Sequence, residues 1–129
     1  MKELTNSEFP IPIGAYSNGL AIPIGDRTLV FLTGQVALNK DGKVMFPNDP
    51  AKQTEYIFQK IDSLLHEAGG SLDNTVKVVI YVTNMNDFSI ISPIRNKFLG
   101  KARPVSTLVE VSRLTIDNCV IEIEVTAIF

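Results

Sequence analysis

The stretch CVIEIEVTAIF, residues 119–129, alternates along its whole length and decides the fold class. One set of alternate side chains, from Cys119 to Ala127, is entirely apolar, and the set between them mixes apolar residues with Glu122, Glu124 and Thr126. Successive side chains of a strand point to opposite faces of a sheet, so the pattern predicts a strand with one face in a core. The other face is too apolar for an ordinary solvated surface, and we expect neighbouring subunits to cover it.

The stretch from Asp49 to Gly70 predicts the longest helix. Asp49 is an N-cap acceptor, Pro50 fits the first helical position, and Gly69 and Gly70 favour a stop. Side chains at i, i+3, i+4 and i+7 spacing form one face that is expected to pack on a sheet. These residues are Thr54, Ile57, Phe58, Ile61, Leu64, Leu65 and Ala68.

The remaining segments complete an α+β fold. By the same cap pattern, Ser92-Pro93 predicts the start of a second, shorter helix that runs to about Gly100. Further strands are expected at residues 16–24, 28–33, 35–38, 75–83 and 105–111, with a hairpin turn at 25–27. In the strand over 75–83, Val76, Val78, Ile80 and Val82 are expected on one side. We therefore expect one domain over residues 1–129, with a single mixed sheet of about six strands and two helices on one face.

Composition excludes several classes of protein. The 129 residues carry a net charge of −2, which counts against a general nucleic-acid binder. The one cysteine rules out an internal disulfide and a cysteine-cluster metal site, and it fits a reducing compartment. No apolar run approaches the ~20 residues of a membrane span, and the first residues lack the apolar core of a signal peptide. We expect a cytoplasmic protein with no membrane partner.

Six segments, in this order and spacing, carry a resemblance to a known family: IGAYSNG (13–19), TGQ (33–35), KVVIYV (77–82), NDF (86–88), VEVSRL (109–114) and IEIE (121–124). They resemble the signature segments of the Rid family, the reactive intermediate deaminases, also called the YjgF family and formerly L-PSP endoribonucleases. The resemblance implies a chorismate-mutase-like fold that assembles as a barrel-cored homotrimer with ligand clefts between subunits. It also implies hydrolysis of 2-imino acids or their enamine tautomers to ketoacid and ammonia, without a metal or other cofactor.

This chemistry needs few groups. An imine carbon is already electrophilic, so the protein has to hold the substrate carboxylate and position a water. By resemblance, Glu122 orients the water, Tyr16 lines the cleft, and Thr33 supplies a hydroxyl where serine is usual. Read from the residues alone, Tyr16 could equally be an ordinary packed tyrosine, and Glu122 with Glu124 a solvated or interface face.

The chain departs from the family pattern at the residue that is expected to bind the substrate carboxylate. Ser106, followed by Thr107, stands where the resemblance places an arginine, Ser92 stands in place of an asparagine, and Arg95 in place of a tyrosine. A serine hydroxyl is one neutral donor, whereas an arginine offers a charged two-pronged fork. The departure counts against the standard 2-imino acid activity. Arg95 could supply the missing charge, although an arginine on a short helix is often just solvated.

Three functions remain open at this stage. The first is hydrolysis of an imine or enamine, and the second is a non-catalytic trimer that binds a small metabolite through backbone N–H groups around Ser106 and Thr107. The third, RNA cleavage, is disfavoured because there is no basic stripe and His66 is the only histidine. Arg103 and Lys101 are further candidates for an anion contact. We expect His66 on the surface and Cys119 in the core.

Overall fold

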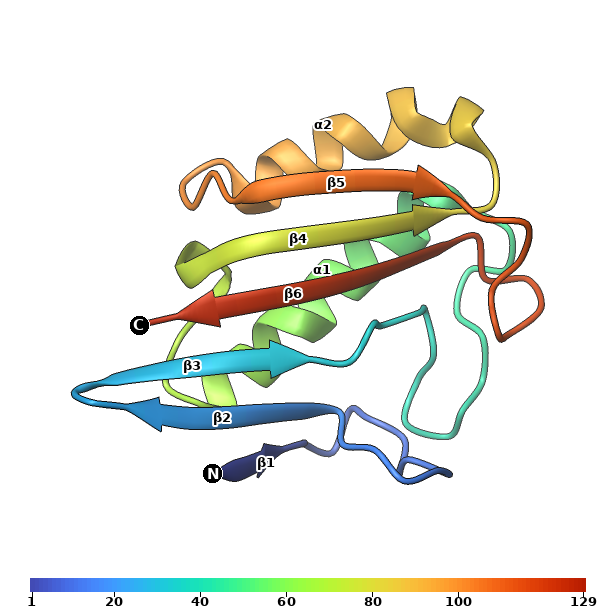
Figure 1. Cartoon of the computed structure of the whole chain (residues 1–129). Helices are drawn as coiled ribbons and strands as arrows, with labels where there is room; N and C mark the ends of the chain where they lie inside the picture. Colours follow the sequence, from blue (N-terminus) through green and yellow to red (C-terminus); the bar gives the residue numbers. More distant parts are fainter.

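The computed structural model describes all 129 residues and contains one six-stranded sheet with two α-helices (Figure 1). The strands are β1 (Lys2–Leu4), β2 (Gly19–Ile24), β3 (Arg27–Leu32), β4 (Thr75–Val82), β5 (Val105–Glu110) and β6 (Ile121–Ile128). The α-helices are α1 (Pro50–Glu67) and α2 (Phe88–Leu99), and the short 3₁₀ helices are η1 (Leu72–Asn74) and η2 (Met85–Asp87). The α+β prediction is confirmed.

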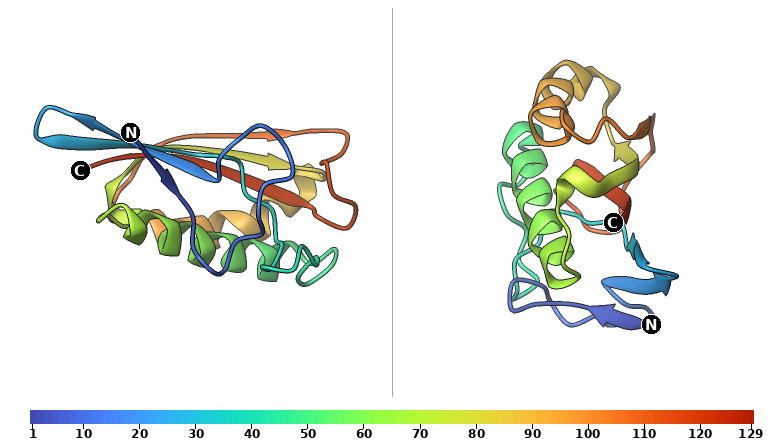
Figure 2. Two further views of the ribbon diagram at one scale, coloured as in Figure 1. Left: turned by 90° about the horizontal axis from the view of Figure 1, so that it is seen from below. Right: turned by 90° about the vertical axis from the view of Figure 1, so that its left-hand side faces the viewer.

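The sheet has the order β1-β2-β3-β6-β4-β5. Only β4 and β5 run parallel, and α2 is the crossover that such a pair requires. All other neighbouring strands are antiparallel. Both α-helices lie on one side of the sheet, as Figure 2 shows edge-on, and the opposite side carries no helix.

The core lies between α1 and the inner face of the sheet. The inner face of β6 is buried along its length, from Ile121 to Ala127, as the alternation predicts. The predicted apolar face is buried along α1, and Ala68, which caps the C-terminal end of the helix, is half-buried. Asp49 caps the helix by accepting a hydrogen bond from Lys52 N at 3.0 Å. Phe58 of α1 stacks on Phe98 of α2 with ring centroids 5.2 Å apart, which joins the two helices.

The predicted start of α2 at Ser92 is wrong. The helix begins at Phe88, directly after the 3₁₀ turn that Asn84 caps, and Pro93 lies inside it. A proline removes the hydrogen bond to the carbonyl four residues earlier, here that of Ser89. Pro93 and Ser89 are both exposed, so water can satisfy that carbonyl and the helix continues.

Two strand predictions also need correction. Val76 is exposed rather than on the inner face, because the register against β6 shifts between Thr75 and Lys77 and buries Thr75 instead. The expected strand at 35–38 is reduced to two isolated bridges, Gln35 with Ile123 and Leu38 with Val44. The short strand β1 had no signal in the sequence.

The face of the sheet away from the helices, which we call the outer face, exposes large apolar side chains. Phe31 of β3 is 46% exposed, and Val105 and Val109 of β5 are 69% and 39% exposed. All three lie in register with outer-face residues of neighbouring strands, Thr126, Lys77 and Tyr81 respectively. Large apolar side chains are thus exposed on both halves of the outer face, with Thr126 and Lys77 between Phe31 and Val105.

One charged residue of α1, Lys60, is buried, and the amphipathic pattern does not single it out. Its Nζ donates a hydrogen bond to Leu38 O at 2.8 Å and lies 4.7 Å from the ring centroid of Phe9. Burial lowers the pKa of Lys60 to about 8, against a smaller opposing effect of Cys119. The ammonium is therefore held in place by a backbone acceptor and an aromatic face while its burial costs stability.

This burial predicts a distinct pH dependence of stability. Above pH ~8 the folded chain loses the proton of Lys60 while the unfolded chain keeps it, so the free energy of unfolding should rise with pH toward ~10. Lys60→Met should remove this rise, which amounts to at most about 1.4 kcal/mol for each unit by which the two pKa values differ. Urea unfolding between pH 7.5 and 10 measures it. Lys52→Met, on the exposed side of α1, should keep the wild-type slope, and a Lys60→Met slope equal to the wild type contradicts the prediction.

Candidate functional site

Three of the predicted site residues line one cavity of about 570 Å³, which we call the Glu122 cavity. Tyr16 comes from the loop before β2, Thr33 follows the end of β3, and Glu122 is the second residue of β6. The exposed Ile11 and Ile13 of the N-terminal loop line its rim. Residues far apart in the sequence thus meet because β3 and β6 are neighbours in the sheet.

The Glu122 carboxylate lies against the bare backbone of Gly34. A Cβ atom on Gly34 would come within 2.5 Å of Glu122 Oε2, so any larger residue there would displace the carboxylate. The segment is fixed beside β6 because Gln35 N donates to Ile123 O at 2.8 Å and Ile123 N donates back to Gln35 O at 3.0 Å. The absence of a side chain at Gly34 therefore leaves the space that the Glu122 carboxylate occupies.

The surroundings of Glu122 also affect its protonation. Burial raises its pKa above the usual range, and the negative charge of Glu124 adds to the effect. Glu124 itself accepts a hydrogen bond from the Tyr81 hydroxyl and does not line the cavity. A half-buried carboxylate with a raised pKa is a better proton acceptor than a solvated one.

The hydroxyl residues Thr33 and Tyr16 of the cavity differ in how firmly they are held. Thr33 Oγ1 donates to Ser17 O at 2.5 Å, and Thr33 O accepts from Gln35 Nε2 at 2.9 Å. Tyr16 is 52% exposed, and its hydroxyl has no hydrogen-bond partner within the chain. Thr33 is therefore part of the cavity wall, and the Tyr16 hydroxyl is free to meet a ligand or another subunit.

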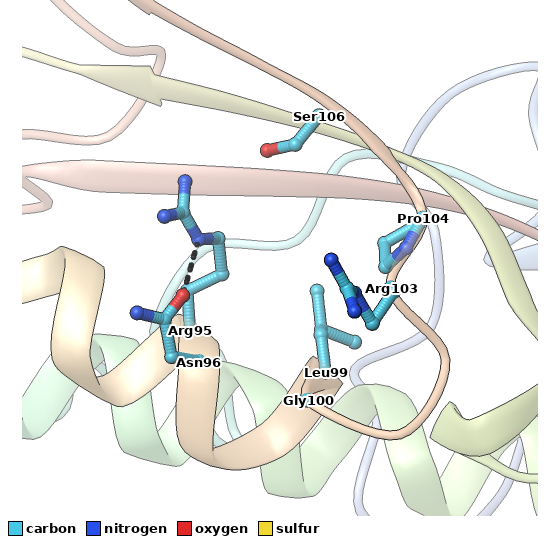
Figure 3. Close-up of a pocket in the computed structure, with 7 residues that line it drawn as sticks. All are labelled: Arg95, Asn96, Leu99, Gly100, Arg103, Pro104 and Ser106. Carbon is cyan, nitrogen blue, oxygen red and sulfur yellow. Dashed lines mark hydrogen bonds between the residues drawn. The ribbon is translucent and has the colours of Figure 1, made fainter.

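A second group of predicted residues meets between α2 and β5, around a cavity of about 570 Å³ that we call the arginine cavity (Figure 3). Arg95 and Ser106 line it, and Ser92 Oγ accepts a hydrogen bond from Arg95 Nη2 at 3.0 Å. Thr107 is in register with Val79 and so faces the outer side, whereas Ser106 is in register with the buried Val78. Arg103, which the sequence indicated only as a further candidate, also lines the cavity.

The two cavities do not join within one chain. Glu122 is in register with Tyr81 near the end of β4, whereas Ser106 is in register with Val78 near its start. The two side chains also belong to opposite faces of the sheet, because Glu122 lies on the outer face and Ser106 on the helix face. Within one chain, Glu122 and Ser106 therefore face away from each other.

The remaining candidates lie outside both cavities. His66 is exposed, with Nδ1 2.7 Å from Asp62 O, and Cys119 is buried, as the sequence predicts for both. No group of three or more His, Cys, Asp or Glu residues could hold a metal ion. Neither helix has the length and apolar character needed to cross a membrane. Lys60 lines the Glu122 cavity, a position that the periodicity of α1 did not indicate.

Comparison with known proteins decides the family. The family model described as "Endoribonuclease L-PSP" matches residues 6–129. The chain belongs to this family. A RutC family protein of Pyrococcus horikoshii is similar to it, with 36% identity over 128 residues, covering 98% of both chains. The expected Rid or YjgF membership is thereby confirmed.

Solved structures of L-PSP family proteins show the same fold. A putative endoribonuclease of Thermotoga maritima superposes with a TM-score of 0.87 at 27% identity, covering 100% of this chain and 98% of the other. A conserved Rid family protein of Yersinia pestis, of unknown function, gives 0.84 at 34% identity, covering 98% and 97%. The expected chorismate-mutase-like arrangement of two helices on a six-stranded sheet is confirmed.

The environment of Glu122 predicts a stability change in this L-PSP family member. A raised pKa means that the folded state binds the proton more tightly than the unfolded state, so stability falls as pH rises through the window between the two pKa values. Glu122→Gln should therefore unfold at a higher temperature than the wild type at pH 7, and the difference should shrink toward pH 4. Thermal unfolding followed by circular dichroism measures it.

Glu67→Gln, at the exposed end of α1, controls for the loss of a carboxylate elsewhere. It should not reproduce the pH-dependent gain. A Glu122→Gln protein less stable than the wild type at pH 7 would mean that the carboxylate makes stabilising contacts that outweigh its burial.

Proposed function

We propose that this protein hydrolyses a reactive imine, or its enamine tautomer, to a carbonyl product and ammonia. The observation that carries the proposal is the Glu122 cavity, in which a half-buried carboxylate of raised pKa lies beside Thr33 and the free hydroxyl of Tyr16. Membership of the L-PSP family, which includes proteins of the Rid group, supports the same chemistry. No cofactor is needed, because the imine carbon is itself electrophilic.

The reaction balances with water as the only other reactant. Glu122 accepts a proton from water as the water oxygen forms a bond to the imine carbon, and the nitrogen takes up a proton from bulk water. The resulting carbinolamine loses its hydroxyl proton to bulk water as the C–N bond breaks, and the amino group leaves as ammonia with the proton returned from Glu122. In this proposal the Tyr16 hydroxyl donates a hydrogen bond to the reacting nitrogen or oxygen.

The substrate carboxylate needs a cation, and Lys60 is the one cationic side chain that lines the Glu122 cavity. Lys60 is turned toward Leu38 O, which leaves Arg95 of another copy of the chain as the proposed grip. Ser106 and Ser92 lie beside Arg95 and add hydroxyl groups to this half of the site. Thr107 follows Ser106 in the chain but faces the opposite, outer side of the sheet. The proposed cleft therefore joins the Glu122 cavity of one protomer to the arginine cavity of the next.

The proposed assembly is a homotrimer. The apolar outer face supports association, and the number three follows from the family resemblance. Its proposed partners are a small imine, enamine or carboxylate ligand and further copies of the chain, with no nucleic acid and no membrane. The proposed location is the cytoplasm, consistent with a single buried free thiol.

A non-catalytic ligand-binding trimer is the alternative, and one observation favours it. The hydroxyl of Ser106 lies where the resemblance leads us to expect an arginine, so the carboxylate grip depends on Arg95, whose guanidinium is already partly engaged by Ser92 and Asn96. RNA cleavage is disfavoured by the net charge of −2 and by an exposed, solitary His66.

The activity itself is the direct test. When 2-iminobutyrate is generated in situ by a threonine dehydratase, the wild type should accelerate the release of ammonia. Glu122→Gln should lower the rate by about 10²-fold or more, the typical contribution of a positioned general base. Arg95→Gln should raise KM more than it lowers kcat, because it removes binding rather than proton transfer.

Glu67→Gln is the matched control for the glutamate and should retain the wild-type rate. An inert wild type that still binds 2-oxobutyrate would favour the binding-only alternative. If the wild type is inert and Ser106→Arg is active, the protein lacks only a cation that binds the substrate carboxylate.

The outer face gives a separate prediction about assembly. Phe31→Asp places a charge on an apolar side chain that is 46% exposed at the centre of the outer face, and it should convert the trimer to a monomer. Ile90→Asp, on α2 and 43% exposed, is the matched control and should leave the trimer intact. Size-exclusion chromatography with light scattering measures the mass. A monomeric wild type, or an unchanged mass for Phe31→Asp, would contradict the proposed interface.

A further inference from the structure

The arginine cavity carries two positive charges and no negative one. Its lining consists of Arg95, Asn96, Leu99, Gly100, Arg103, Pro104 and Ser106. Neither arginine lies within ion-pair distance of a carboxylate. Two lysines of the same stretch are paired, Lys97 at 3.3 Å from Glu55 and Lys101 at 3.6 Å from Asp73. The charges left unpaired in this region are thus the two that line the cavity.

The side chain of Arg95 is held in a defined position. Its Nε donates to Asn96 Oδ1 at 3.2 Å, shown as the dashed line in Figure 3, and Nη2 donates to Ser92 Oγ at 3.0 Å. A guanidinium has five N–H donors, so three remain for a ligand. Both partners are neutral, so the positive charge is positioned without being compensated.

Arg103 reaches the cavity from a different element. It lies in the loop after α2 with a φ of 49°, and its backbone N donates to Leu99 O at 2.8 Å. The left-handed conformation costs free energy in a residue that has a Cβ, and such strain is found where surrounding structure fixes a functional side chain. Its guanidinium makes no hydrogen bond within the chain, and Figure 3 shows it pointing into the same space as Arg95, from the other side.

We infer that the arginine cavity binds a ligand with two carboxylates, which makes the substrate class a 2-imino dicarboxylic acid. The assignment of an imino group rests on the proposed function. The assignment of two carboxylates rests on the two arginines of the cavity. Each guanidinium presents a planar fork that matches one carboxylate. A monocarboxylate leaves the second fork without a partner, whereas a dicarboxylate neutralises both charges.

The placement of the arginines favours two separate acid groups over one phosphate. Arg95 belongs to α2 and Arg103 to the following loop, and Figure 3 shows their guanidinium groups on either side of the cavity with Ser106 facing the space between them. Two acids joined by a short carbon chain can meet both forks. A single phosphate would have to draw both arginines to one point, away from the Asn96 and Ser92 contacts of Arg95.

The test compares two ligands of equal chain length by isothermal titration calorimetry on the full chain in its native assembly. The ligands are 2-oxoglutarate, the product of a five-carbon imino dicarboxylate, and 2-oxopentanoate, which lacks the second acid. The wild type should bind 2-oxoglutarate about tenfold more tightly or better, since one added charge-assisted contact is worth at least that ratio. Inorganic phosphate is the third probe and should bind more weakly than 2-oxoglutarate.

Variants separate the two arginines. Arg103→Gln should bring the two affinities to within about twofold of each other while leaving that for 2-oxopentanoate unchanged, and Arg95→Gln should weaken both ligands. Arg27→Gln removes one exposed positive charge on the β2–β3 hairpin and should change neither affinity. Equal affinities in the wild type, equal losses for both ligands in Arg103→Gln, or tighter binding of phosphate would each overturn the inference.

Binding of these products requires no turnover, so the outcome is independent of the hydrolysis assay. A preference for 2-oxoglutarate in a protein that releases no ammonia would uphold the dicarboxylate cavity and reject the proposed reaction. Ammonia release without that preference would uphold the reaction and reject the cavity's role.

Discussion

The packing of β6 against α1 is the contact on which the rest of the structure depends. β6 lies between β3 and β4, and its inner face from Ile121 to Ala127 is buried. Burying one isoleucine contributes roughly 1.5–3 kcal/mol, so this row of side chains is a large part of the core. Because the side-chain period of a strand is two, the same packing fixes Glu122 on the outer face, and a register slip of one residue would bury the glutamate. Core formation and placement of the candidate general base are therefore one constraint.

A second consequence of this arrangement is that a small domain can use both faces of its sheet. The helix face holds the core, and the outer face is the proposed contact with other copies of the chain. The two cavities follow the same division, since the Glu122 cavity adjoins the outer face at one end of the sheet and the arginine cavity lies on the helix side of the edge strand β5. The Glu122 cavity holds the candidate proton acceptor, and the arginine cavity holds two positive charges without a carboxylate in its lining.

The sequence predicted those features that a local pattern determines. The alternation in residues 119–129 and the cap at Asp49 gave β6 and α1, because both depend on side-chain periodicity and short-range hydrogen bonds. The start of α2 was missed because Pro93 is a good first residue of a helix, and only the solvent exposure of Ser89 shows why it is tolerated further in. The shift that exposes Val76 depends on pairing with a strand 50 residues away, which no local pattern reports. The resemblance selected the two groups of candidate residues, but their separation within a chain follows from sheet order, which the sequence does not show.

The central claim is that one cleft uses Glu122 of one protomer and Arg95 of another. It is tested most directly by mixing Glu122→Gln and Arg95→Gln proteins, each with low activity, after unfolding and refolding them together. When the two variants assort at random in equal amounts, about a quarter of all clefts would join an intact Glu122 to an intact Arg95, so about a quarter of the wild-type ammonia release from 2-iminobutyrate should return. Mixed trimers, verified by mass spectrometry, that recover no activity would contradict the account.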